Sequence, residues 1–285
     1  MKNLTIILPA KNEADCLRNL LPEILKQMQG AEIIIVNDGS TDDTLAVCAA
    51  LPVRVISHPY PKGNGAAVKS GARASQGKIL VFMDADGQHQ AQDIQQLLEK
   101  LEQGYDMVVG ARTRHSQAGM HRAVANGFYN RLASWMVGQK VEDLTSGFRA
   151  VDADKFRKYL YMLPNGFSYP TTITMSFFRA GYAVGYVPIY APKRIGNSHM
   201  RIMHDGVRFL LIIFKIGSLY SPLKLFFPIS VFFFLLGAGN YVHTYLTLHR
   251  FTNMSALLLI TAMIVFLIGL VSEQITMLAY KDSEH

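Results

Sequence analysis

The sequence predicts an α/β domain with a mostly parallel sheet and helices on both of its faces, followed by a membrane-interface helix and a hairpin of two transmembrane helices. Apolar strand-like runs, polar loops and amphipathic helices alternate from residue 4 to about residue 110, which is the pattern of parallel sheets. Half of the 285 residues are hydrophobic, and the excess lies near the C-terminal end. The expected domains are residues 1–200, 201–222 and 223–285.

Short apolar runs rich in β-branched residues mark the expected strands, and polar loops follow them. Between the strands we expect amphipathic helices, of which the first ends near Gln27, the next covers residues 91–103 and a longer one covers residues 115–143. A last strand pairs into the sheet before the membrane segment. The strands are expected over residues 4–8, 32–36, 53–57, 78–83, 106–110 and 184–189, with a further one leading into Val151.

Residues 201–222 combine a narrow polar stripe with a wide apolar face, which suits a helix lying at the membrane interface. The alternative is a helix packed on the soluble domain. Two apolar runs follow, over about residues 223–248 and 254–280, and each is long enough to span a hydrocarbon layer of about 30 Å. Only five residues separate them, so we expect a helical hairpin. The stripe consists of Arg201, His204, Asp205, Arg208 and Lys215.

The basic residues flank one side of this hairpin, which predicts that the soluble domain faces the cytoplasm. Cys16 and Cys48 fall in expected helices among apolar neighbours, so we expect reduced core thiols and a reducing compartment. The N-terminal residues enter a strand directly and carry no secretory signal. We therefore expect an integral protein of the inner or cytoplasmic membrane, with its soluble domain and both termini in the cytoplasm.

The chain carries a formal net charge of +7, which favours anionic partners. Its basic residues gather at the membrane border and at the ends of expected elements, and they form no separate patch. This distribution disfavours nucleic acid and favours phosphate groups and a lipid bilayer. The sequence leaves open whether the chain forms a homo-oligomer.

Two carboxylates, Asp84 and Asp86, end the buried strand at residues 78–83, and Gln88 adds an amide oxygen. In α/β proteins ligands bind at the carboxyl ends of strands. Neighbouring carboxylates repel each other unless a cation lies between them, and Mg²⁺ or Mn²⁺ with oxygen ligands fits this need. Such an ion keeps open positions for substrate phosphates. The alternative interpretation of these residues is a simple turn.

The segment Gly63-x-Gly65-x-x-Val68 partly imitates a dinucleotide-binding fingerprint. It lacks the third glycine and follows a proline-rich loop, so a nicotinamide site is disfavoured. We expect a tight turn that lets Lys62 approach a phosphate.

Arginines recur at the ends of later elements. Arg112 follows the strand at 106–110, Arg122 lies in the first turn of the next helix, and Arg149 begins a strand. A guanidinium beside a metal–phosphate site can stabilise negative charge through paired hydrogen bonds, although a single arginine is more often a solvated surface residue.

Together these segments resemble the family 2 glycosyltransferases of GT-A fold, in particular the polyprenyl-phosphate glycosyltransferases of the dolichol-phosphate mannose synthase type. The resemblance covers residues 4 to about 200 in the right order. It is carried by Pro9-Ala10-Lys11-Asn12-Glu13, Asn37-Asp38-Gly39-Ser40-Thr41-Asp42, Lys62-Gly63-x-Gly65-Ala66, Asp84-Ala85-Asp86-Gly87-Gln88, Gly110-x-Arg112, Thr145-Ser146-Gly147-Phe148-Arg149 and Gly196-Asn197-Ser198.

The resemblance implies a role for each matching position. Asp84 is placed with the nucleotide and the metal, while Asp86 and Gln88 are metal ligands on the diphosphate. The catalytic residues implied are Asp84, Asp86, Arg112 and Arg149. The nucleotide-binding residues implied are Pro9, Ala10, Glu13, Asp38, Lys62 and Asp84. The residues implied for the acceptor phosphate are Arg112, Arg122, Arg149 and Ser198.

The sequence departs from the family pattern just before Ser198. Lys193 occupies the position of a usual arginine, Arg194 is displaced by one residue, and His199 replaces a lysine. Either Lys193 or Arg194 could meet the acceptor phosphate as a point charge, but lysine cannot reproduce the paired hydrogen bonds of arginine.

The resemblance implies an inverting, metal-dependent transfer of a sugar from a UDP- or GDP-sugar to a membrane polyprenyl phosphate, either undecaprenyl or dolichyl phosphate. Alternatives on the same fold are a transferase with another membrane acceptor and a processive polysaccharide synthase. Two spans and the lack of a Gln-x-x-Arg-Trp motif disfavour the synthase. A catalytically silent membrane adaptor is the alternative from another class, and the complete acidic motif disfavours it.

Overall fold

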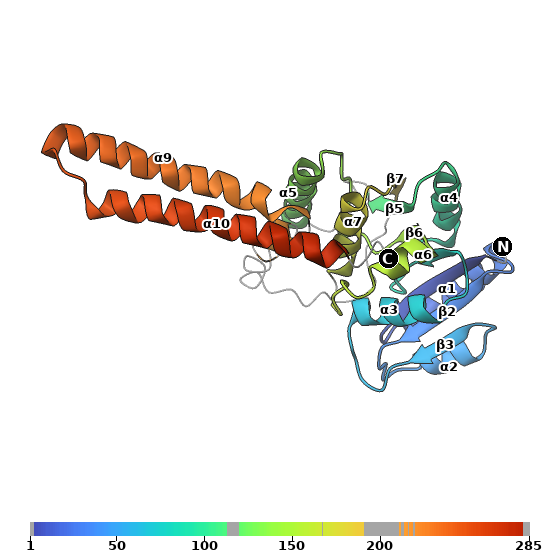
Figure 1. Ribbon diagram of the computed structural model, residues 1–285. Helices are drawn as coiled ribbons and strands as arrows, with labels where there is room; N and C mark the ends of the chain where they lie inside the picture. The colour runs from blue at the N-terminus through green and yellow to red at the C-terminus, as the bar shows by residue number, and fades with distance from the viewer. Residues whose placement is uncertain are drawn as a thin grey trace. The chain divides into compact units, whose positions relative to one another are not determined.

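The computed structural model describes residues 3–112, 120–166, 168–190, 211, 214–215, 217–218, 220 and 221–281, without side-chain detail for 120–126, 279 and 281 (Figure 1). The chain divides into two compact units, Met1–Asp205 and Gly206–His285. Each unit is described by itself below.

A seven-stranded sheet forms the centre of the first unit, with the strand order β3-β2-β1-β4-β6-β5-β7. Only β6 runs antiparallel to its neighbours, β4 and β5, and the other pairs are parallel. The prediction of a mostly parallel sheet is therefore confirmed. The strands are β1 (Leu4–Ala10), β2 (Glu32–Asn37), β3 (Arg54–Ser57), β4 (Ile79–Phe82), β5 (Met107–Arg112), β6 (Arg149–Asp152) and β7 (Val184–Ile189).

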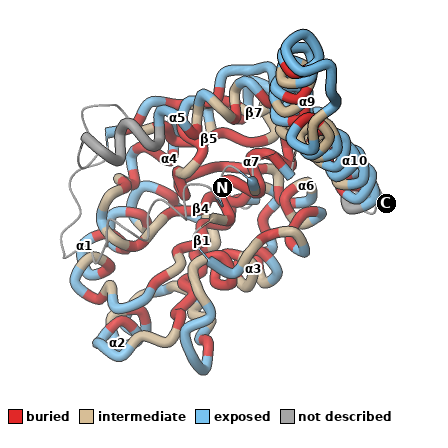
Figure 2. The backbone as a smooth tube through the Cα atoms, turned by 90° about the vertical axis from the view of Figure 1, so that its left-hand side faces the viewer, coloured by how far each residue is buried: buried red, intermediate tan, exposed pale blue. Residues whose placement is uncertain are grey.

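Helices cover both faces of this sheet because its central strands are apolar on both sides. On one face, α1 (Ala14–Gln27) and α4 (Ala91–Glu102) pack their leucines and isoleucines against Ile6 and Leu8. On the other face α3 (Asn64–Ala74) approaches so closely that a Cβ on Gly71 would lie 2.4 Å from Ile7 Cγ2. The short helices α2 (Thr44–Ala49) and α6 (Ala153–Lys158) complete the layers. Figure 2 shows the strands as the buried centre of this unit.

The strand register brings distant segments to one edge of the sheet. Strands β1, β2, β4 and β5 end at this edge because they run in the same direction. The antiparallel β6 begins there, since Arg149 pairs with Phe82 of β4 and with Val109 of β5. The polar loops after β1, β2, β4 and β5 and the loop before β6 therefore meet.

Some helices differ from the sequence-based expectation. Helix α5 (Met120–Val137) ends before the expected boundary at residue 143, and residues 115–119 of the expected helix lie outside the described residues. Helices α6 and α7 (Tyr169–Arg179) were not predicted. Every residue from Tyr169 to Phe177 is buried, so α7 lacks the polar face that makes a helix recognisable in sequence.

The second unit contains the predicted hairpin, formed by α9 (Pro222–Leu248) and α10 (Asn253–Lys281). Both helices are long and apolar enough to cross a membrane. Ser230 donates a hydrogen bond to the carbonyl of Ala262 (2.8 Å), and Gly237 lets α9 pack closely against Leu258 and Leu259. Their outward side chains are exposed over most of their length (Figure 2). Most of the predicted interface helix, including residues 201–210, lies outside the described residues.

Gly65, in the first turn of α3, provides a test of how closely this helix packs against residues 164–166. A Cβ on Gly65 would lie 2.1 Å from the carbonyl oxygen of Pro164, and this backbone atom has little freedom to move. We expect Gly65→Ala to destabilise the first unit by about 1–3 kcal/mol, measured by thermal unfolding in detergent. Gly127→Ala is the control, because a Cβ there meets nothing within 4 Å. Equal stability of the two variants would contradict the close packing.

Candidate active site

A cavity of about 680 Å³ lies at the carboxyl edge of the parallel strands, where the register brings the polar loops together. Its volume is in the range of small-molecule and cofactor sites. It includes all six predicted nucleotide-binding residues, and Asp86 as well. The lining consists of Pro9, Ala10, Lys11, Glu13, Asp38, Pro61, Lys62, Gly63, Asn64, Ala67, Asp84, Ala85 and Asp86.

Asp38 holds one wall of this cavity in place. Its carboxylate accepts hydrogen bonds from the backbone amides of Lys62 (2.7 Å) and Gly63 (2.8 Å). His58 Nδ1 lies 2.7 Å from Asp38 Oδ1, and the other ring nitrogen lies 2.9 Å from Ser70 Oγ. Burial opposes ionisation of Asp38, but the hydrogen bonds from His58, Lys62 and Gly63 hold its pKa below the ordinary value. The aspartate therefore fixes the turn that presents Lys62 to the cavity.

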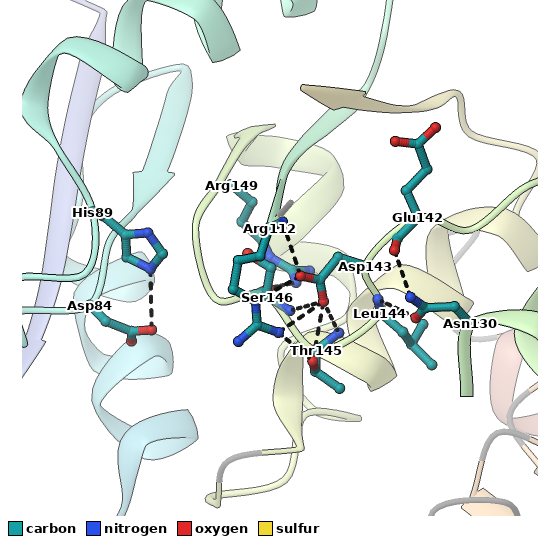
Figure 3. Close-up of polar contacts among 10 residues, drawn as sticks. All are labelled: Asp84, His89, Arg112, Asn130, Glu142, Asp143, Leu144, Thr145, Ser146 and Arg149. Atoms are coloured by element: carbon teal, nitrogen blue, oxygen red, sulfur yellow. Dashed lines mark hydrogen bonds and ion pairs between the residues drawn. The ribbon is translucent and has the colours of Figure 1, made fainter. Parts of the chain in front are cut away.

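Asp84 follows β4, and Figure 3 shows its contact with His89. His89 Nε2 lies 3.7 Å from Oδ2, and Asn64 Nδ2 lies 3.4 Å from Oδ1. Burial would raise the pKa of Asp84, but the contacts with His89 and Asn64 and the charge of Arg112 hold it below the ordinary value. The carboxylate is thus kept ionised and oriented at the cavity.

The oxygen atoms at this position fit a hard divalent cation. Asp84 and Asp86 both line the cavity, and the backbone amide of Gln88 donates to Asp86 Oδ1 (3.2 Å). In the part of the chain that the structure describes, no group of three His, Cys, Asp or Glu side chains could form a closed metal cage. Two carboxylates and an amide instead suit an open site that is completed by substrate phosphates. Gln88 does not line the cavity, so its role as a ligand stays a prediction.

Arg112 ends β5 and forms a paired ion bridge with Asp143 (Figure 3). Its Nε donates to Asp143 Oδ2 (2.8 Å) and its Nη2 to Oδ1 (3.0 Å) and to Thr145 Oγ1 (2.7 Å). Burial favours neutral forms of both groups, but their ion pair raises the pKa of Arg112 and lowers that of Asp143. The Arg112 side chain is 25% exposed and that of Asp143 only 3%. About a quarter of the Arg112 side-chain surface therefore remains accessible.

Arg149 is not brought into the cavity. It is fully buried, and its guanidinium donates to the carbonyls of Ser146 and Pro170 and to the hydroxyl of Thr174. Its Nε has no hydrogen-bond partner among the described residues, and burial lowers its pKa. The structure thus places this arginine behind the loop that precedes β6, where it ties that loop to the start of α7.

The remaining acceptor residues are not placed. The side chain of Arg122 and all of Lys193, Arg194 and Ser198 lie outside the described residues. Their roles stay predictions.

The sequence-based search missed three residues that contact the predicted site. Asn64 and His89 orient Asp84, and Asp143 orients Arg112. Asn64 occupies the x position of Lys62-Gly63-x-Gly65-Ala66, whereas His89 directly follows the acidic motif and Asp143 lies two residues before Thr145-Ser146-Gly147-Phe148-Arg149. Their contacts depend on tertiary structure, and no spacing rule predicts them.

The fold and the cavity define an α/β domain with an acidic edge at the carboxyl ends of its strands and an arginine beside it, in a chain that also carries a hairpin of two long apolar helices. Residues 5–160 match the glycosyl transferase family 2 model, and residues 221–278 match the GtrB C-terminal hairpin model. The first match covers more than half of the chain, which therefore belongs to glycosyl transferase family 2. The hairpin match and the two apolar helices indicate that the protein associates with a membrane.

The curated relatives include polyprenyl-phosphate sugar transferases. A dolichyl-phosphate hexose transferase from Haloferax volcanii is 27% identical over 200 residues, which are 70% of this chain and 86% of the relative. Polyprenol monophosphomannose synthase from Mycolicibacterium smegmatis is 26% identical and covers 68% and 80%. A dolichol-phosphate mannosyltransferase from Pyrococcus furiosus is 34% identical, but the match covers 52% of this chain and 46% of that protein.

Among solved structures, the fold is similar to glucosyl-3-phosphoglycerate synthase from Mycobacterium tuberculosis. Its complex with Mn²⁺, UDP-glucose and glycerol 3-phosphate has a TM-score of 0.61 at 23% identity, covering 76% of this chain and 79% of that one. The likeness establishes the GT-A fold of the first unit.

The hydrogen bonds that Asp38 accepts from Lys62 and Gly63, together with its contact with His58, make stability depend on pH. We expect Asp38→Asn to lose about 1.5–3 kcal/mol at pH 7, because an amide cannot accept all the hydrogen bonds that the carboxylate accepts. The folded pKa is lowered, so the carboxylate contributes fully above its unfolded pKa of about 3.9 and this contribution is lost as the pH falls through the folded pKa. The difference in melting temperature from wild type should therefore shrink below about pH 4.

Asp15→Asn is the control for this pH series, because the Asp15 side chain is 94% exposed. A difference in melting temperature between wild type and Asp38→Asn that stays constant as the pH falls from 7 to about 2 would contradict this role of Asp38.

The buried position of Arg149 predicts a loss of stability on conservative substitution. In Arg149→Lys, one ammonium cannot reach the acceptors on Ser146, Pro170 and Thr174 together, and each carbonyl left unpaired costs about 1–3 kcal/mol. We expect a lower unfolding temperature than for Arg73→Lys, a control on the exposed face of α3. An unchanged unfolding temperature with a loss of activity would instead support direct contact of Arg149 with a ligand.

Proposed function

We propose that the protein transfers a sugar from a UDP- or GDP-sugar to a membrane polyprenyl phosphate, with inversion and with a divalent metal. The observation that carries the proposal is the cavity, which gathers Asp84, Asp86, Asp38 and Lys62 in a chain that also has a membrane hairpin. The names of the relatives, which act on dolichyl or polyprenyl phosphates, support this acceptor class.

The donor fits the cavity chemically. Its nucleoside would lie along Pro9, Ala10, Glu13 and Asp38, while the diphosphate would lie between Lys62 and the acidic edge. Two carboxylates alone would repel a diphosphate, so a bound Mg²⁺ or Mn²⁺ on Asp86, Asp84 and Gln88 would neutralise that charge and make the nucleotide a better leaving group. The complex of the similar glucosyl-3-phosphoglycerate synthase with Mn²⁺ and UDP supports such a metal.

The acceptor needs no general base. A phosphate monoester is ionised at neutral pH, so one of its oxygens can attack the anomeric carbon directly. The new bond forms on the face opposite the nucleotide, and the bond to the β-phosphate oxygen breaks with its electron pair. An α-linked donor thus gives a β-linked product. The accessible part of Arg112 would hold the acceptor phosphate, so the chain acts by positioning and electrostatics.

Arg122, Ser198 and either Lys193 or Arg194 would complete the acceptor site. We assign Arg149 a supporting role behind this site because its guanidinium is occupied by protein acceptors. The hairpin suits an acceptor whose tail stays in the bilayer, and the basic flanks of the hairpin favour a cytoplasmic domain in the inner or cytoplasmic membrane.

The test is transfer of radiolabelled sugar from a panel of UDP- and GDP-sugars into an organic-extractable lipid, with Mg²⁺ or Mn²⁺ and polyprenyl phosphate. We expect lipid-phase label that requires metal and falls about 100-fold or more in Asp86→Asn. The control is Asp15→Asn, which removes the same single negative charge at a side chain that is 94% exposed. This variant should retain wild-type activity.

Two outcomes separate the alternatives. Label in a lipid other than the supplied polyprenyl phosphate would indicate a different membrane acceptor. Binding of nucleotide without transfer from any donor in the panel would overturn the proposal and favour a silent adaptor.

A further inference from the structure

The loop from Asp143 to Phe148 connects the two charged parts of the site, and this connection rests on contacts at each of its ends. The loop precedes β6, the strand that lies between β4, which leads to Asp84, and β5, which ends at Arg112. Figure 3 shows Asp143, Thr145 and Ser146 of this loop gathered around Arg112, with Asp84 and His89 to their left.

At its first end the loop holds the guanidinium. Asp143 accepts two hydrogen bonds from the Arg112 side chain and one from the Arg112 backbone amide (3.3 Å). The same carboxylate accepts from the amides of Thr145 and Ser146, both at 3.1 Å. Asp143 therefore fixes the shape of the loop and the direction of Arg112 with one buried group.

At its second end the loop packs on the acidic edge. A Cβ on Gly147 would lie 2.8 Å from Asp84 Oδ2, so the loop backbone lies directly against this carboxylate. The ring of Phe148 stacks on His89, with centroids 4.8 Å apart, and His89 in turn faces Asp84. A movement of the loop would therefore shift both the Gly147 backbone and the His89 ring, the two groups that lie against Asp84 here.

Other elements hold the middle of the loop. Asn130 of α5 accepts from the amide of Leu144 (3.0 Å) and donates to the carbonyl of Glu142 (2.6 Å). Behind it, Arg149 donates to the carbonyl of Ser146, and Tyr169 OH lies 3.3 Å from the carbonyl of Gly147. Backbone groups of four successive residues are therefore fixed by side chains from outside the loop or by Asp143.

We propose that Asp143 is a positioning residue and that the loop 143–147 is a rigid spacer, which sets the distance between the Arg112 guanidinium and the Asp84 carboxylate. In the proposed function, on which this inference rests, that distance separates the acceptor phosphate from the donor diphosphate. Asp143 itself is almost wholly buried and accepts six hydrogen bonds from Arg112, Thr145 and Ser146, so it acts through Arg112 and does not touch the substrate.

The first experiment compares Asp143→Asn with Glu142→Gln in the full-length protein in detergent. Both remove one negative charge from this part of the chain, but Glu142 lies just before the loop, is more exposed, and forms an ion pair with the exposed Lys140. For Asp143→Asn we expect the KM for polyprenyl phosphate to rise about tenfold or more, because Arg112 loses its charged partner. The KM for the donor should stay within about twofold, and Glu142→Gln should match wild type.

Gly147→Ala tests the other end of the spacer. Its Cβ would displace Asp84, so we expect this variant to raise the KM for the donor and the metal concentration needed for half-maximal rate. The effects of Asp143→Asn and Gly147→Ala on the two KM values should not be additive when both substitutions are combined, because both act on one rigid loop. Equal changes in both KM values for Asp143→Asn, or strict additivity in the double variant, would overturn the spacer.

A second readout does not depend on activity. In protein labelled with ¹⁵N-arginine, the Nε–H of Arg112 should give a slowly exchanging signal, which Arg112→Lys identifies by its loss. We expect Asp143→Asn to speed its exchange about tenfold or more, while Glu142→Gln leaves it unchanged. Unchanged exchange in Asp143→Asn would overturn the inference. If wild type fails to transfer sugar but this exchange pattern holds, the proposed function fails and the role of Asp143 stands.

Discussion

The antiparallel insertion of β6 between β4 and β5 is the constraint on which the site depends. Because Arg149 pairs with both Phe82 and Val109, the start of β6 is locked to the ends of its two neighbours. Asp84 lies two residues beyond Phe82, and Arg112 lies three beyond Val109. A one-residue slip in either pairing would turn these side chains to the opposite face of the sheet. The pairing of the strand backbones therefore sets the relative position of Asp84 and Arg112, and side-chain contacts only refine it.

That arrangement concentrates charge in a partly buried place, and the surrounding groups compensate it in different ways. Asp38 and Asp143 are satisfied by backbone amides and by one charged or ionisable partner each. Arg149 has only neutral acceptors among the described residues, so it carries a larger desolvation cost. This cost is tolerated where the guanidinium fixes the carbonyls of Ser146 and Pro170, which hold the loop and the start of α7. The buried Arg149 thus lowers stability through its desolvation but holds the loop before β6 in shape.

Strands and amphipathic helices could be predicted from the sequence because each has a local periodicity, and the cavity residues followed from motifs at strand ends. The sheet order could not, since nothing local distinguishes β6 as antiparallel. Helix α7 was missed because it is buried all round. Arg149 was expected at the acceptor phosphate because the family resemblance places it there. Its burial becomes visible only when α7 covers that face of the sheet.

The hairpin follows a different rule because lipid offers no hydrogen bonds. Glu273 lies late in the second span, within α10. In the structure its carboxylate accepts from Ser221 Oγ (2.8 Å) and from the backbone amide of Leu223 (3.2 Å), an orphan donor in the first turn of α9. One turn further along α10, Thr276 donates to the carbonyl of Ser218 (2.9 Å). Glu273 thus joins the start of α9 to the end of α10. An acidic side chain, which is costly in a bilayer, therefore fixes the two helices to each other at the open end of the hairpin.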